Sequence, residues 1–345
     1  MATRVIRYVD PNSPTGGNGT TSSVTAGDAN RAFVSIAAWQ TARVKNLVTA
    51  DEISECRVRN NGALYTDPGV FSISSSWVTD STRYIDFIYD GPNTWHGGWG
   101  APYTWRFSAT PASSNGVING ISATNLVIAS FKNILINQIS GAGSALNVSG
   151  AMTVLTFKNC LITSSSNTSL AVAVRTGGGG GTIYLINCIV QAFGTVSNNH
   201  GLMTNSGGFQ VYNSIITANA ARAVEIGAGG FINIRNSYAH SVSSSGFDVS
   251  SNLTKTTVAS SDDTGDLTGV PFDTATFLDP KATNNTGVFD LSAGSVLIGQ
   301  GTDYSSLGAS YQNDIMGVTR ELPWAIGAFK GPSGVHRPLP CFRPV

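Results

Sequence analysis

The sequence has 345 residues, and 20 basic residues balance 20 acidic ones, so the formal net charge is zero. Only 12% of the residues are charged, against about 25% in an average soluble domain. This neutral, charge-poor composition excludes a phosphate-neutralising nucleic-acid binder, and no apolar run reaches the roughly 18–20 residues of a membrane helix. We therefore expect neither nucleic acid nor a membrane as a partner.

Residues 1–50 predict a terminal segment that includes a capping helix. Met1–Arg7 contains no apolar stretch of signal-peptide length, so secretion by that route is not expected. Residues 31–47 space their apolar side chains roughly as a helix does, with Asp28 upstream as the predicted N-cap. Such a helix would cover one end of a stacked β-structure and prevent edge pairing there.

Residues 51–115 predict irregular first coils that carry a loop rich in aromatic side chains. The loop is also rich in Gly and Pro, which indicates a loop rather than a core strand. Its rings suit three roles: packing over the first coils, forming a subunit interface, or stacking on sugar rings. The candidate interface or carbohydrate-stacking residues are Trp95, His96, Trp99, Tyr103 and Trp105.

Residues 116–260 predict the regular body of the fold, because one pattern recurs five times. Each repeat has an asparagine with an apolar residue two positions before it and another two positions after it. These asparagines are Asn133, Asn159, Asn187, Asn213 and Asn236, at intervals of 26, 28, 26 and 23 residues. A period of this length, rich in β-branched residues, is typical of one coil of a parallel β-solenoid. Asn tolerates the left-handed backbone of a sharp corner, and stacked amides can bond to each other, so we expect an asparagine ladder.

Two cysteines fall at equivalent positions of neighbouring repeats, Cys160 and Cys188. Stacking would bring their backbones within disulfide range, but we favour a pair of small buried thiols over a disulfide or a metal site. No histidine or carboxylate shares their period, and four cysteines in a chain of this length do not form a disulfide scaffold. We expect no metal site and no cofactor.

Both ends of the chain resemble a known family. The residues that carry the resemblance are Tyr8–Ser13, Gly16–Thr20 and Ala37–Trp39 at the start, and Phe289–Ile298, Gly301-Thr302, Asp314, Gly317, Arg320 and Ile326–Phe329 near the end. They resemble the opening and closing segments of right-handed parallel β-helix proteins of tailed phages and prophages. The resemblance implies an all-β fold, a right-handed single-stranded parallel β-helix with an N-terminal capping helix. Residues 261–335 would then form the last coils and the closing segment, and residues 336–345 an extended tail.

Polysaccharide cleavage, a frequent activity of β-helices, finds few suitable residues here. Glycoside hydrolases use two carboxylates roughly 5–9.5 Å apart, and a Ca²⁺-dependent lyase needs several carboxylate oxygens. Residues 91–224 hold no Asp or Glu over 134 positions, and they include four of the five asparagine repeats. We therefore expect no catalytic residue on the body. An acid/base site of Asp80, Asp86, Asp90 and His96, or a Ca²⁺ loop at Asp262–Asp266, is the remaining alternative to ordinary turn carboxylates.

Together these features predict a non-enzymatic structural protein of a tailed-phage virion. A knob-like capsid decoration or cement protein, displayed on the particle and stabilising it, fits the compact chain best. Its expected partners are further copies of itself in a homotrimer and the phage capsid protein, or a tail protein instead, with assembly in the host cytoplasm. The alternative function is a tailspike-like protein that binds or depolymerises host surface polysaccharide, with a host surface glycan as its partner.

Overall fold

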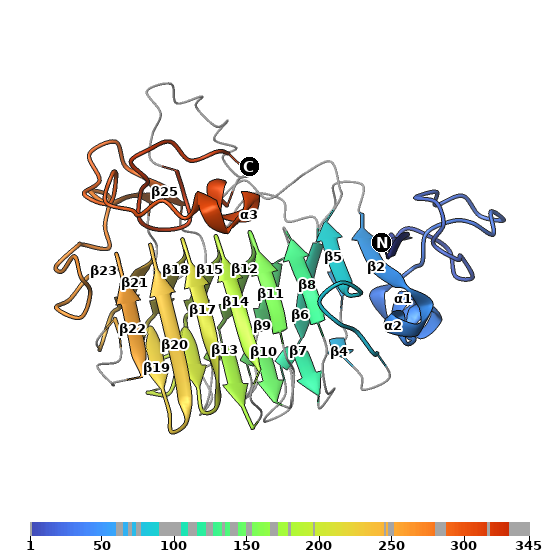
Figure 1. Cartoon of the computed structure of the whole chain (residues 1–345), viewed down its shortest axis with the longest axis horizontal. Helices are drawn as coiled ribbons and strands as arrows, with labels where there is room; N and C mark the ends of the chain where they lie inside the picture. The colour runs from blue at the N-terminus through green and yellow to red at the C-terminus, as the bar shows by residue number, and fades with distance from the viewer. Residues whose placement is uncertain are drawn as a thin grey trace.

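The computed structural model describes residues 2–59, 65–67, 71–73, 77–89, 105–109, 116–121, 127–132, 135–138, 144–149, 154–165, 172–178, 181–195, 197–244, 246–247, 252–279, 288–315 and 318–330. Over these residues the chain forms a parallel β-helix, in which three parallel sheets run side by side along the long axis (Figure 1). Successive coils supply strands to the three sheets in a constant order, and we call the sheets the first, second and third wall. The predicted all-β parallel β-helix with an N-terminal helix is confirmed.

The strands of each wall are adjacent in space but come from successive coils. The first wall contains β1 (Thr3–Val9), β2 (Glu52–Val58), β5 (Ile85–Tyr89), β8 (Val127–Lys132), β11 (Val154–Lys158), β14 (Thr182–Ile186), β17 (Gly207–Tyr212), β20 (Gly230–Arg235) and β22 (Leu253–Thr256). The second wall contains β3 (Tyr65–Asp67), β6 (Trp105–Ala109), β9 (Leu135–Gln138), β12 (Leu161–Ser164), β15 (Ile189–Ala192), β18 (Ile215–Ala218), β21 (Tyr238–Ser241) and β23 (Ala259–Ser260). The third wall contains β4 (Phe71–Ile73), β7 (Gly116–Ile121), β10 (Ser144–Ser149), β13 (Val172–Gly177), β16 (Leu202–Thr204) and β19 (Val224–Ile226). Two further strands, β24 (Phe277–Asp279) and β25 (Val288–Leu291), pair antiparallel.

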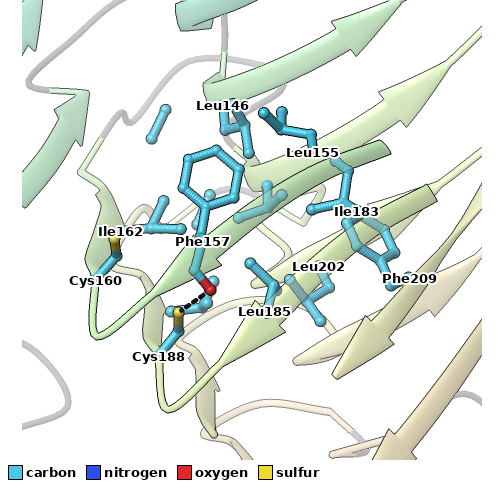
Figure 2. Close-up of a cluster of buried hydrophobic side chains, with 14 of the residues drawn as sticks. Leu146, Leu155, Phe157, Cys160, Ile162, Ile183, Leu185, Cys188, Leu202 and Phe209 are labelled. Atoms are coloured by element: carbon cyan, nitrogen blue, oxygen red, sulfur yellow. Dashed lines mark hydrogen bonds between the residues drawn. The ribbon is translucent and has the colours of Figure 1, made fainter. Parts of the chain in front are cut away.

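Equivalent residues of successive coils form columns, because neighbouring strands pair in parallel and in register. In the first wall Leu155 pairs with Ile183, Ile183 with Phe209, and Phe209 with Ile232. All four side chains are buried, and Figure 2 shows the first three among the apolar residues that fill the space between the walls. A single coil could not bury these residues, so the stacking itself creates the core.

Two thiols lie in this core, and they confirm the preference for buried cysteines over a disulfide. Cys160 and Cys188 are both buried and are not joined to each other. Cys188 Sγ donates to the carbonyl of Phe157 at 3.5 Å (Figure 2), and Cys160 Sγ donates to the carbonyl of Lys158 at 3.3 Å. Both thiols thus bond to backbone carbonyl groups of the coil, and no covalent bond joins them.

The predicted asparagine corners lie between the first and second walls. Asn159, Asn187, Asn213 and Asn236 have φ values of 54°, 53°, 48° and 47°, so all four adopt the left-handed conformation expected of them. Asn187 Nδ2 donates to Asn159 Oδ1 at 3.3 Å, and Asn236 Nδ2 donates to Asn213 Oδ1 at 3.2 Å. Asn133, the first of the five predicted, lies outside the described residues.

The expectation of a continuous amide ladder is wrong at its centre. Asn187 Oδ1 is buried and has no hydrogen-bond partner, and Asn213 Nδ2 donates instead to the carbonyl of Tyr311 at 3.3 Å. The cause is the C-terminal part of the chain, whose backbone carbonyls lie against the corner and compete for the amides. The ladder position after Asn236 is held by Thr257, with φ 56°, so the corner does not require asparagine in every coil.

The C-terminal segment, residues 267–330 in their described parts, packs on the outer face of the second wall. In Figure 1 it folds back over the ends of β12, β15 and β18. A second hydrophobic cluster forms there, separate from the core inside the coils. The second wall contributes its outward column, Leu161, Ile189, Ile215, Tyr238 and Ala259, and the segment contributes Val270, Phe277, Leu291, Leu297, Ile315, Ala325, Ile326, Ala328 and Phe329.

Arg320 holds the end of this segment together from inside. Its guanidinium donates to the carbonyls of Ala325 at 3.4 Å, Phe329 at 3.2 Å and Gly327 at 2.9 Å. Burial lowers the pKa of Arg320 to about 10, although nearby Asp314 opposes the shift. The side chain therefore stays charged near neutral pH, and its bonds hold the three carbonyls around one guanidinium group.

A short helix covers the N-terminal end of the coil, but it is smaller than predicted. α1 spans Ile36–Arg43, followed by α2 (Leu47–Ala50). Ser35 is the N-cap, accepting from Ala38 N at 3.1 Å, so the prediction of Asp28 as the cap is wrong. Asp28 closes a turn instead, by accepting from Asn30 N at 2.8 Å. Trp39 of α1 is fully buried and stacks on Trp77 with ring centroids 5.6 Å apart, which closes the core at this end.

Candidate functional site

The described residues form a groove of about 330 Å³ on the outer face of the first wall. Its floor is formed by β11 and β14, which contribute Thr156, Lys158, Tyr184 and Ile186. Its other side is formed by η1 (Ser305–Leu307) and α3 (Ala309–Gln312) of the C-terminal segment, through Leu307 and Tyr311. The groove is open to solvent and therefore accessible to a ligand.

The period of the strands places these floor residues outside the coil. Leu155 and Phe157 point into the core, so Thr156 and Lys158 between and beside them point outward. Thr156 pairs in register with Tyr184, and Lys158 pairs with Ile186. The floor is therefore two columns of the regular repeat, built by the same alternation that fills the core.

The C-terminal side of the groove is fixed to the asparagine corner. Asn187 Nδ2 donates to the carbonyl of Ser310 at 3.0 Å, and Asn213 Nδ2 donates to the carbonyl of Tyr311 at 3.3 Å. Gly308, with φ 121°, supplies the turn between η1 and α3, in a conformation that residues with a side chain rarely adopt. Two corner amides thus position this side of the groove: Asn187, which also bonds to Asn159, and Asn213.

An aromatic cluster extends the site along the first wall. Tyr311 packs edge to face on Tyr212, with ring centroids 4.9 Å apart. Tyr304 also packs edge to face on Tyr212, with centroids 5.8 Å apart. Arg235 Nη1 donates to Tyr212 Oη at 2.5 Å and lies over the Tyr212 ring, 5.3 Å from its centroid. Burial, with the neighbouring Tyr212 and Tyr184 hydroxyls, raises the pKa of Tyr311 to about 12. Its hydroxyl is protonated at physiological pH, as an unshifted tyrosine hydroxyl would also be.

The aromatic loop singled out from the sequence is not tested. Trp95, His96, Trp99 and Tyr103 lie outside the described residues, and of Trp105 only the backbone is described, in β6. Asp90 also lies outside them.

The other predicted acid/base residues have structural contacts. Asp80 accepts from Thr82 N at 2.8 Å and Arg83 N at 2.7 Å, and the backbone and hydroxyl bonds from Thr82 lower the pKa of Asp80. Asp86 pairs in register with Glu55 on the adjacent coil, and Arg4 Nη1 contacts both carboxylates, at 2.8 Å and 2.5 Å. Burial alone would lower the pKa of Arg4, but its bonds to Asp86 and Glu55 raise it above the usual value.

The acidic loop at Asp262–Asp266 closes the last coils. Asp262 accepts from Gly246 N at 2.6 Å and Thr264 Oγ1 at 2.6 Å, and Asp266 accepts from Val258 N at 3.1 Å. Within the described part of the chain, no group of three or more His, Cys, Asp or Glu side chains could hold a metal ion. None of the described helices has the length and apolar character needed to cross a membrane.

The sequence analysis missed the groove. Lys158 and Tyr184 belong to the recognised repeat, and a lysine and a tyrosine on the outward phase of neighbouring repeats are a signal that could have been found. Leu307 and Tyr311 lie in a non-repeating segment, and nothing in the local pattern indicates that this segment returns to β11 and β14.

Comparison with known proteins adds little to this geometry. No family model and no curated protein matches the sequence. Among solved structures, the chain is similar to the crystal structure of pectate lyase Pel9A, with a TM-score of 0.37 and 17% identity over 96% of this chain and 97% of that one. A likeness at this level carries no argument about chemistry, so function has to be inferred from the residues of this chain.

Proposed function

We propose that the chain is a non-enzymatic structural protein of a tailed-phage virion, a capsid decoration or cement protein. One observation carries the non-enzymatic part: the coils between residues 91 and 224 contain no carboxylate. This stretch holds every strand from β6 to β18, the middle of all three walls. The side chains of residues 91–224 therefore supply neither a pair of catalytic acids nor the carboxylates of a Ca²⁺ site.

The carboxylate pair of the first coils supports the same proposal. Glu55 and Asp86 lie on adjacent coils, as a catalytic pair would, but their side chains are only 3% and 9% exposed. Both contact the same atom of Arg4, and Arg57 Nε adds a contact to Glu55 at 2.5 Å. Two carboxylates neutralised by arginines and withdrawn from solvent stabilise a coil, and they are poorly placed to donate or accept a substrate proton.

A capped, hydrogen-bonded stack of coils suits a rigid element displayed on a particle. The interior is one continuous core, closed by α1 at one end and covered along the second wall by the C-terminal segment. The virion setting comes from the resemblance of both chain ends to phage β-helix proteins. With it we propose a homotrimer, a capsid protein as partner or a tail protein in its place, and assembly in the host cytoplasm.

Copy number in purified particles tests the virion role. Quantitative mass spectrometry should find the chain at a fixed ratio to the major capsid protein if it decorates the capsid, and at a few copies per particle if it belongs to the tail. Its absence from the particles would overturn the virion role.

Incubation with host surface polysaccharide tests the non-enzymatic role. We expect no new reducing ends and no unsaturated products. Turnover that is lost in Glu55→Gln or Asp86→Asn but retained in Asp80→Asn would overturn the proposal and identify a depolymerase. Turnover that survives all three variants would overturn it as well and place catalysis elsewhere.

A further inference from the structure

We propose that the outer face of the first wall between β14 and β20 binds a neutral saccharide. The ring of Phe231 stacks on the sugar, and the amides of Gln210 and Asn233 bond to its hydroxyl groups. This site goes beyond the structural role proposed above, because a rigid virion protein could also use it to adhere to a surface glycan.

Phe231 forms a flat platform on this face. It points outward from β20 and pairs in register with Gly208 of β17. A Cβ atom at position 208 would overlap Cζ, Cε1 and Cε2 of the Phe231 ring, so the end of the ring lies across the buried Gly208. One face of the ring therefore covers the sheet and the other faces solvent, which leaves Phe231 38% exposed. Such an aromatic face suits the apolar C–H face of a sugar ring.

Two side-chain amides lie beside this platform. Gln210 follows Gly208 by two residues and Asn233 follows Phe231 by two, so both point outward, and they pair in register on strands roughly 4.8 Å apart. Within the part of the chain that the structure describes, neither side chain has a hydrogen-bond partner, and neither amide is closed off from solvent. An amide offers both an acceptor and donors, and a sugar hydroxyl also does both. The pair is therefore suited to neighbouring hydroxyls of one sugar.

The absence of charge around the platform favours a neutral ligand. The outward residues that pair with it are Thr182 and Tyr184 of β14 and Thr254 of β22, and all three are uncharged. The next outward residue of β20 is Arg235, whose guanidinium donates to Tyr212 Oη and lies over the Tyr212 ring. A ligand on this face therefore meets hydroxyl, amide and aromatic groups.

The platform continues into the groove, because Tyr184 belongs to both. A saccharide of two or more rings that lies across the strands would extend from β20 toward the groove, whose volume of about 330 Å³ is at the small end of the ~300–1,000 Å³ typical of ligand pockets. β14, β17 and β20 lie side by side and pair in register (Figure 1), and their inward residues are core. The face is thus formed before a ligand arrives, and binding needs little ordering of the backbone.

NMR on the full chain tests the site with neutral probes. The probes are cellotetraose and the galactose tetrasaccharide with the same linkage, and sorbitol serves as a polyol without a ring. We expect at least one tetrasaccharide to shift the side-chain amide signals of Gln210 and Asn233, and sorbitol to leave them unchanged. Phe231→Leu, which removes the ring, and Gly208→Ala, which displaces it, should each weaken binding about fivefold, whereas Phe231→Tyr should retain most of the affinity.

Matched variants separate the site from general effects on the fold. Gln210→Met and Asn233→Leu keep the size of the side chain but not its hydrogen bonds, and each should weaken binding about fivefold. Met203→Ala truncates an outward residue of the same coil on β16 of the third wall, and it should leave binding unchanged. Equal losses in Met203→Ala and Gln210→Met, in variants with unchanged circular dichroism, would overturn the site. So would binding of neither tetrasaccharide, or binding unaffected by Phe231→Leu, since the ring would then only cover the sheet. Binding that is lost at about 1 M salt would show an ionic contact and overturn the assignment to a neutral ligand.

Discussion

The first and second walls are built by the same coils, yet they differ in how they meet solvent. On β20 of the first wall, buried Ile232 and Ile234 alternate with exposed Phe231 and half-buried Asn233 and Arg235. On β15 and β18 of the second wall, all residues of each strand are buried. Parallel strands covered on both faces have no alternating pattern, and here the second cover is the C-terminal segment. The segment touches the first wall only locally, where Tyr304 and Tyr311 pack on Tyr212, whereas on the second wall it buries the whole outward column. The second wall therefore depends on the segment more strongly than the first wall does.

Replacing Arg320 should give the largest difference in stability between the two walls. Arg320→Met leaves the carbonyls of Ala325, Gly327 and Phe329 without this donor, and each buried unsatisfied acceptor costs about 1–3 kcal/mol. We expect the free energy of opening the C-terminal segment to fall by about 4 kcal/mol. Hydrogen exchange should accelerate in residues 288–330 and on β15 and β18, with β2 and β5 of the first wall protected.

Arg175→Met is the control for this change, because Arg175 lies half-buried on β13 of the third wall, outside the cluster that the segment forms. It should lower stability by less than about 1 kcal/mol. If Arg320→Met accelerated exchange equally in both walls, the second wall would not depend specifically on the segment.

Two adjacent isoleucines of β18 provide the next largest test. Ile215 points outward into the cluster with the C-terminal segment, and Ile216 points inward into the core, and both are fully buried. Replacing either with Ala should lower the free energy of unfolding by about 3 kcal/mol. Ile216→Ala should loosen the walls of the coil together, whereas Ile215→Ala should loosen the segment first. Identical exchange patterns in the two variants would contradict the division into two clusters.

The sequence predicts the inside of the coil well, because that information is local and periodic. The five asparagine repeats place the corners between the first and second walls, and the apolar residues two positions before each described asparagine lie in the core. The apolar residues two positions after, such as Leu161 and Ile189, are equally regular in sequence but face outward into the C-terminal segment. When a strand is buried on both faces, its sequence does not show which face points into the coil and which points toward the C-terminal segment.

The candidate site could be predicted only in part, since it joins a repeat to a non-repeating segment. Lys158 and Tyr184 lie on strands of the recognised repeat, so their outward phase follows from the period of two. Tyr311 reaches the groove because Asn187 and Asn213 bond to carbonyls of α3, and their preference for these carbonyls over each other is a tertiary effect. The same competition makes the ladder discontinuous.

Acid should loosen the second wall before the first, because His240 stacks on Phe272 of the segment with centroids 4.3 Å apart. Burial lowers the pKa of His240 from its usual 6.5 to about 4, although nearby Asp262 opposes the shift. Between these two values the unfolded chain binds a proton that the folded chain does not. Stability is therefore fully present above pH 6.5 and is lost as pH falls toward 4, by about 3 kcal/mol.

Unfolding of His240→Gln as a function of pH isolates this contribution. Asp262 has a lowered pKa and also loses stability in acid, so the wild-type curve contains both effects. The difference between the wild type and His240→Gln should rise with pH between about 4 and 6.5 and be flat outside that window. Parallel curves would show that His240 does not link acid to the second wall.

The smallest effect concerns the corner itself, where the two walls meet. Asn213 has φ 48°, accepts from Asn236 Nδ2 and donates to the carbonyl of Tyr311. Asn213→Gly and Asn213→Ala lose the same two bonds, but only Ala adds the strain of a left-handed backbone, about 1–2 kcal/mol. Denaturant unfolding should therefore place Ala below Gly by that amount, while exchange in residues 302–311 accelerates equally in both. If Gly and Ala were equally stable, the corner would be held by its amide bonds and not by its backbone conformation. In that case another reason would be needed for the left-handed conformation of Thr257 at the corner after Asn236.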